Sequence, residues 1–135
     1  MSRKPLLIAM DLEGVLVPEV WIAVAEKTGI EGLRLTTRDV ADYDELMQGR
    51  LRLLRENNLT LTDIQEVIRT LHPFSGADAF VEGIRSKYQL VILSDTYYEF
   101  AAPLMKQLGW PTLFCNTLVV NEKQEVVDYV LRQKD

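Results

Sequence analysis

The stretch that decides the fold is Leu6–Pro18, LLIAMDLEGVLVP, which joins a short apolar run to two carboxylates. The run Leu6–Met10 is typical of a fully buried strand inside a parallel sheet. Asp11 and Glu13 follow it two residues apart, a spacing that places both side chains on one face of an extended chain. Like charges this close favour a bound cation or a shared proton. Mg²⁺, which carboxylates hold together with a substrate phosphate, fits such a pair.

A second apolar run with polar residues at its end lies further along the chain. Residues 89–95, QLVILSD, predict another buried strand, which ends at Ser94 and Asp95. Because ligands bind beyond the carboxyl ends of parallel strands, we expect Asp11 and Ser94 to share one crevice. The segment also leads toward a helix N-terminus, where free N–H groups suit an anion. Alternatively, each of these residues alone is a common turn or helix-start residue, and Asp95 is a cap for the next helix.

The remaining pattern predicts an α/β domain with a parallel sheet and an all-helical insertion after the first strand. We expect an α/β core of residues 1–17 and 73–135, and a helical cap of residues 18–72. In the cap, Thr62 and Gln65 fit a capping box. The other predicted elements are a helix opened by Pro18 and closed by Gly29, helical spacing over 36–58, a helix after Pro73, a helix broken near Pro103, a strand over 112–115 and a hairpin over 118–131.

Composition limits the class of partner. The chain has 135 residues, 47% hydrophobic content and a net charge of −5, with 15 basic and 20 acidic residues. We therefore expect one compact domain and no nucleic-acid partner, because no basic stripe stands out. No apolar run approaches the length of a membrane span, so no membrane partner is expected. The single cysteine, Cys115, excludes an intrachain disulfide and favours a reducing, cytoplasmic location.

These motifs resemble those of the haloacid dehalogenase (HAD) superfamily of phosphotransferases, whose first motif is usually Asp-x-Asp. The form with Glu second is similar to the bifunctional phosphoserine phosphatase / homoserine kinase branch. The stretches that carry this similarity run in order along nearly the whole chain: DLEG, VPEVWIAVAEKTGI, DYDELMQGRLRLL, DIQEVIRTL, VILSDTYYEFAAPLMKQLG and LRQKD. A general sugar or nucleotide phosphatase of the superfamily is the less favoured alternative.

The resemblance implies catalytic roles for the residues after the first two strands. Asp11 would attack phosphorus to form an aspartyl-phosphate, and Glu13 would act as general acid and then as base. Asp11 and the backbone carbonyl of Glu13 would hold Mg²⁺. Ser94 would hydrogen-bond the phosphoryl group, and amides around Gly14 and Asp95 would stabilise its charge.

The resemblance also implies a substrate pocket in the cap, with phosphoserine as substrate and homoserine as an alternative acceptor to water. Arg50 would bind the phosphoserine carboxylate, Tyr43 occupies an aromatic cap position, and Glu19 lies one residue from a position that holds the amine. Simpler interpretations exist for two of them. Arg50 lies in GRLRLLR, which also fits a solvated helix face, and Tyr43 also fits a packing aromatic.

The sequence departs from the superfamily pattern after Val120. The Lys of the third motif and the acidic pair of the fourth are not found there. We therefore expect weak binding of Mg²⁺. The family order also places the first strand mid-sheet, so without its second neighbour this strand would offer a bare apolar edge through which copies could associate. Our hypothesis is that this chain is the N-terminal portion of a longer protein. The alternative function is a catalytically inert fragment or phosphate-binding module.

Overall fold

The computed structural model describes residues 4–134 and contains one four-stranded sheet. The strands lie side by side in chain order, and the first three are parallel. The last strand pairs antiparallel with the third, which confirms the predicted hairpin. The strands are β1 (Leu7–Met10), β2 (Gln89–Tyr97), β3 (Thr112–Val120) and β4 (Val126–Val130). The expected α/β class with a mainly parallel sheet is therefore confirmed.

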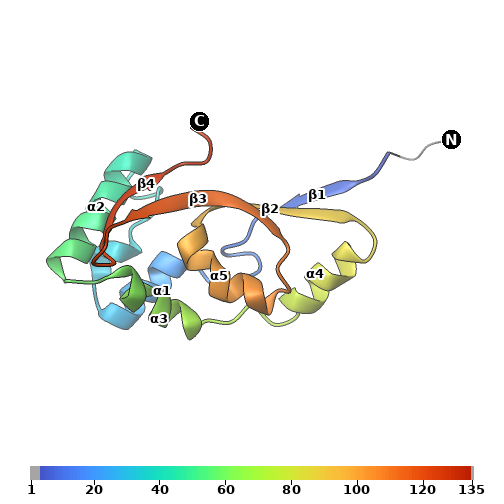
Figure 1. The fold of residues 1–135 in the computed structure, drawn as a ribbon, viewed down its shortest axis with the longest axis horizontal. Coiled ribbons are helices and arrows are strands. Elements are labelled where there is room, and N and C mark those ends of the chain that lie inside the picture. The colour runs from blue at the N-terminus through green and yellow to red at the C-terminus, as the bar shows by residue number, and fades with distance from the viewer. Residues whose placement is uncertain (1–3, 135) are drawn as a thin grey trace.

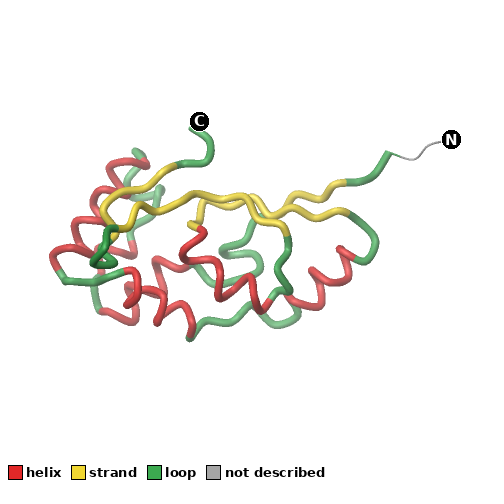
Figure 2. The backbone as a smooth tube through the Cα atoms, viewed as in Figure 1, coloured by secondary structure: helices red, strands yellow, loops and turns green. Residues whose placement is uncertain are grey.

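Helices fill the chain between β1 and β2 and also follow β2. Figures 1 and 2 show the sheet as one layer with the helices gathered on one side of it, and α2 beside the hairpin of β3 and β4. The core lies between the sheet and these helices. The helices are α1 (Val20–Thr28), the 3₁₀ helix η1 (Glu31–Arg34), α2 (Tyr43–Glu56), α3 (Leu61–Arg69), α4 (Ala77–Arg85) and α5 (Tyr98–Gln107).

Local hydrogen bonds explain where the cap helices begin and end. Gly29 ends α1 in the left-handed conformation, with φ 74°. Asp42 accepts from the Glu45 N–H and so begins α2 at Tyr43, well after the start of the amphipathic pattern. The capping box of α3 is formed by Thr60 and Asp63, so the predicted box was wrong by two residues.

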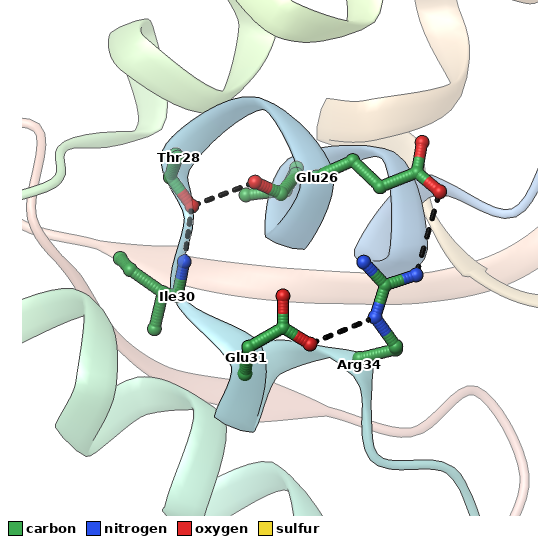
Figure 3. Close-up of polar contacts among 6 residues, drawn as sticks. Glu26, Thr28, Ile30, Glu31 and Arg34 are labelled. Atoms are coloured by element: carbon green, nitrogen blue, oxygen red, sulfur yellow. Dashed lines mark hydrogen bonds and ion pairs between the residues drawn. The ribbon is translucent and has the colours of Figure 1, made fainter.

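The short helix η1 is tied to the end of α1 by surface contacts (Figure 3). The Arg34 guanidinium lies 3.1 Å from Glu31 and 3.4 Å from Glu26. The Thr28 hydroxyl donates to the Val24 carbonyl and accepts from the Ile30 N–H. Exposed ion pairs of this kind add little to stability, so they orient η1 more than they stabilise it.

Helix α5 continues through Pro103, so the predicted break was wrong. Proline has no N–H to donate to the carbonyl four residues earlier. That carbonyl, on Glu99, instead accepts from the Gln65 side-chain amide of α3 at 3.0 Å. A contact between helices therefore replaces the lost helical bond.

The first strand is not buried, contrary to the prediction. Among the described residues β1 pairs with β2 alone, so it forms one edge of the sheet. Leu6 and Leu7 are 65% and 66% exposed. The expected bare apolar edge is therefore present. Within residues 4–134 no helix combines the length and the apolar character that a membrane crossing needs.

Candidate active site

Five of the predicted site residues line one cavity of about 210 Å³ between helices α1 and α2 and the end of β2. They come from the loop after β1, from α2 and from β2, which are far apart in the sequence. Their common position is a result of the tertiary structure. These residues are Glu13, Glu19, Tyr43, Arg50 and Asp95.

Two other predicted residues, Asp11 and Ser94, line a second cavity of about 350 Å³. Asp95 lines both cavities, so the two lie next to each other. Asn116 and Arg132, which the sequence interpretation missed, also line the second cavity. The structure thus brings Asp11 and Ser94 to one crevice, as expected from the carboxyl ends of β1 and β2.

Glu13 is partly buried beside the N-terminus of α1. Its Oε1 accepts from the Val20 N–H at 2.8 Å, so it pairs the backbone donor of the first residue of that helix. Burial raises the pKa of the Glu13 carboxyl, although the Val20 hydrogen bond acts in the opposite direction. Glu19 and Asp11 raise it further. A carboxyl with a raised pKa holds its proton more readily than an ordinary one, which suits a group that gives up a proton and takes one back.

Asp11 is exposed immediately after β1, and its Oδ1 accepts from the Leu12 N–H at 2.7 Å. The turn that follows needs glycine, because Gly14 has φ 76°. The Gly14 N–H donates to the Val17 carbonyl at 2.7 Å. This amide is therefore used within the turn. Gly14 is also absent from the lining of both cavities.

Ser94 and Asp95 lie inside β2, which runs on to Tyr97 instead of ending at Asp95. The pairing of β2 with β3 shifts register between Leu93 and Tyr97, which releases the segment between them from the regular ladder. The Ser94 hydroxyl oxygen accepts from the Thr96 N–H at 3.1 Å. The N-cap of α5 is Tyr97, so the alternative that Asp95 caps this helix was wrong.

Arg50 is only 8% exposed, which contradicts the interpretation of a solvated helix face. Its Nη2 donates to the Leu35 carbonyl at 2.8 Å, and its Cζ lies 4.8 Å from the Trp21 ring centroid. Burial lowers the pKa of the guanidinium. Its Nε is buried without a hydrogen-bond partner among the described residues. A buried donor left unpaired is costly unless a ligand accepts from it.

Tyr43 is held in the cavity wall by Tyr97, a residue to which the sequence interpretation gave no role in the site. The Tyr43 and Tyr97 hydroxyls lie 2.8 Å apart, and Tyr97 is 1% exposed. Burial raises the pKa of both groups, which keeps them as neutral donors. On β4, Tyr129 packs edge-on against both rings and donates to Asp44 at 2.6 Å. The hairpin is thereby joined to α2.

The described residues supply little of a magnesium site. Among residues 4–134 no three His, Cys, Asp or Glu side chains gather closely enough to hold a metal ion. The Glu13 carboxylate accepts from Val20, which leaves Asp11 as the carboxylate exposed at the strand end. Asp11 and the Glu13 carbonyl, the two donors expected for this site, therefore do not by themselves fit a complete magnesium site.

Solved structures show which known proteins have a similar fold. The chain matches a phospho-aspartyl intermediate analogue of phosphoserine phosphatase with a TM-score of 0.76 and 19% identity, over 96% of this chain and 64% of that one. A substrate-bound phosphoserine phosphatase complex matches with a TM-score of 0.74 and 18% identity, over 96% and 64%. A HAD family hydrolase from Salmonella enterica matches with a TM-score of 0.67 and 17% identity, over 93% and 43%. The chain therefore shares its fold with these phosphoserine phosphatases and with this HAD family hydrolase.

Two curated relatives are much more similar to the chain in sequence than these solved structures are. The chain is 62% identical to the phosphoserine phosphatase of Pseudomonas syringae pv. tomato over 129 residues, which are 96% of the chain and 54% of that protein. It is 60% identical to phosphoserine phosphatase ThrH of Pseudomonas aeruginosa over 129 residues, 96% of the chain and 63% of that protein. No protein-family model matches. The expected resemblance to phosphoserine phosphatases is confirmed, and the chain spans roughly half to two thirds of the length of these relatives.

Proposed function

We propose that this chain carries the nucleophile, the proton-transfer group and the carboxylate-binding arginine of a phosphoserine phosphatase. The observation that carries the proposal is Arg50, which lines a cavity together with Glu13 and whose Nε is buried without a hydrogen-bond partner among the described residues. A buried cation with an unused donor suits a substrate that brings its own carboxylate. The phosphoserine phosphatase relatives support the same substrate.

In the first proposed step, Asp11 attacks the phosphorus of phosphoserine. Its Oδ1 is engaged by the Leu12 N–H, so Oδ2 is the oxygen that forms the new bond to phosphorus. The bond from phosphorus to the serine oxygen breaks, and Glu13 transfers its proton to that oxygen. The raised pKa of Glu13 favours the protonated form that this step needs. The Ser94 hydroxyl, whose oxygen already accepts from Thr96, donates to a phosphoryl oxygen.

In the second step, water attacks the aspartyl-phosphate and Glu13 accepts its proton. The bond from phosphorus to Asp11 breaks, which releases phosphate and restores the carboxylate. Homoserine is the proposed alternative acceptor, because its hydroxyl can take the place of water in this step. The chemistry is otherwise the same, so the two acceptors compete for one intermediate.

Substrate recognition is proposed to occur where the cap meets the core. Residues 18–72 form the cap, and the rest of the chain forms the core. Support comes from the cavity of about 210 Å³, whose walls combine Arg50 and Tyr43 of α2 with Asp95 of β2. Arg50 binds the carboxylate of phosphoserine, and Glu19, which is exposed on the same cavity, binds its amine.

Magnesium dependence is part of the proposal, with Asp11 as the carboxylate ligand and the Glu13 carbonyl as a second donor. When bound, Mg²⁺ would offset the charge of the transferring phosphoryl group. The small donor set favours a second candidate function, a phosphate-binding portion that does not turn over substrate. The two candidates differ in whether this 135-residue chain releases phosphate.

The test compares phosphate release from phosphoserine by the wild type and Asp11→Asn, with Mg²⁺ and with or without homoserine. Asn keeps the acceptor for the Leu12 N–H and removes the nucleophile, so activity is expected to disappear. Asp78→Asn is the matched control, because Asp78 accepts from the next N–H in the same way on α4. An active wild type whose activity Asp11→Asn fully retains would refute the mechanism. An inactive wild type would support the phosphate-binding alternative.

A further inference from the structure

We propose that Arg132 binds the phosphoryl group in the cavity that contains Asp11 and Ser94. This inference deepens the proposed function and rests on it for the identity of the substrate. Arg132 lies just beyond β4, in a stretch where the sequence analysis singled out no site residue. The hairpin of β3 and β4 brings it back to the carboxyl end of β2, where it lines the same cavity as Asp11.

Two contacts place Arg132 in this position. Its backbone N–H donates to Asn116 Oδ1 at 2.9 Å, and the Asn116 amide donates to the Asp95 carbonyl at 3.2 Å. Asn116 is 7% exposed, so one buried side chain links the backbone at Arg132 to the backbone beside Ser94. The guanidinium stacks on Phe114, with Cζ 4.2 Å from the ring centroid. Stacking leaves the N–H groups at the guanidinium edge free to donate.

The acidic residues that line the cavity make a cation there favourable for phosphate binding. Asp11 and Asp95 bring two negative charges to its lining, and Arg132 is the cationic side chain among the described residues that line it. Within residues 4–134 the ion pairs involve Arg34 alone, so Arg132 has no carboxylate within 4.0 Å. An incoming phosphate dianion would be repelled by the two acids. A guanidinium that can donate two parallel hydrogen bonds to phosphate oxygens offsets that repulsion.

The test is titration calorimetry of the 135-residue chain with inorganic phosphate, which needs no turnover. Arg132→Gln keeps the backbone contact with Asn116 and removes the charge, so we expect phosphate affinity to fall about tenfold or more. Arg132→Lys should recover part of the lost affinity, because it restores the positive charge but cannot donate two parallel hydrogen bonds. Phe114→Leu should give an intermediate loss. Arg69→Gln is the control, since Arg69 is exposed on α3 outside this cavity.

Unchanged phosphate affinity in Arg132→Gln would overturn the inference, and so would a wild type that does not bind phosphate. Each result is separable from failure of the proposed function. If phosphoserine turnover requires Asp11 but phosphate affinity is the same with and without Arg132, only the proposed role of Arg132 fails. If phosphate binding depends on Arg132 while no phosphoserine is turned over, the phosphate pocket stands and the phosphatase proposal fails.

Discussion

Replacing Arg50 by Met separates recognition of the substrate carboxylate from the chemistry at phosphorus. Phosphoserine and phosphoethanolamine differ only by that carboxylate, so they form a matched pair of substrates. In the proposed complex the carboxylate accepts from Arg50, whose Nε has no other partner. Arg50→Met should therefore reduce kcat/KM for phosphoserine and leave kcat/KM for phosphoethanolamine nearly unchanged.

The size of the effect follows from the kind of contact that is lost. A hydrogen bond to a charged group contributes about 1.5–3 kcal/mol. Since about 1.4 kcal/mol corresponds to a factor of ten, kcat/KM for phosphoserine should fall about 10- to 150-fold. The folded state should be affected much less. Met preserves the unbranched stem against Trp21, and the Leu35 carbonyl that loses its donor belongs to an exposed residue that water can reach. We expect the free energy of unfolding to change by about 1 kcal/mol or less.

The assay is phosphate release from both esters, with urea unfolding as the measure of stability. Arg52→Met is the matched control, because Arg52 lies on the same helix but is exposed. The control should keep the wild-type ratio of the two kcat/KM values. If Arg50→Met reduced both values by the same factor, Arg50 would not recognise the carboxylate, and the reasoning from its buried Nε would be wrong.

Three further predictions address the remaining groups. Glu13→Gln keeps the acceptor for the Val20 N–H, so it should fold while activity falls about 10²- to 10⁴-fold. Burial raises the pKa of Glu13, so the free energy of unfolding of the wild type should fall relative to that of this variant as pH rises above 4.5. Urea unfolding at several pH values measures this difference, and the same pH dependence in both proteins would contradict the prediction. Tyr43→Phe and Tyr97→Phe should show a coupling energy of about 1 kcal/mol in a double-mutant cycle of unfolding, and additive effects would exclude the 2.8 Å hydrogen bond. Leu7→Lys at the edge of β1 should suppress any self-association that light scattering detects in the wild type, and a monomeric wild type would refute association through that edge.

Several sequence predictions failed where a distant contact replaced a local preference. Pro103 is a local signal for a break, yet α5 continues because Gln65 satisfies the carbonyl that the proline leaves free. Ser94 and Asp95 were predicted to end a strand, yet β2 continues past them with a shifted register against β3. Neither the Gln65 contact nor the register of β3 can be derived from short-range patterns, because each partner lies at least 19 residues away in the chain.

The sequence by itself determined the α/β class, the order of the elements and the acids that follow the first strand. Apolar runs, capping residues and glycines act over a few neighbouring residues, so they can be interpreted directly. Only the tertiary structure decided which side chains meet. It buried Arg50 beside Glu13, paired the Gly14 N–H with the Val17 carbonyl, and returned Arg132 to the cavity of Asp11. The physical reason is that burial and the pairing of distant groups depend on how the helices and the hairpin pack, which no local pattern specifies.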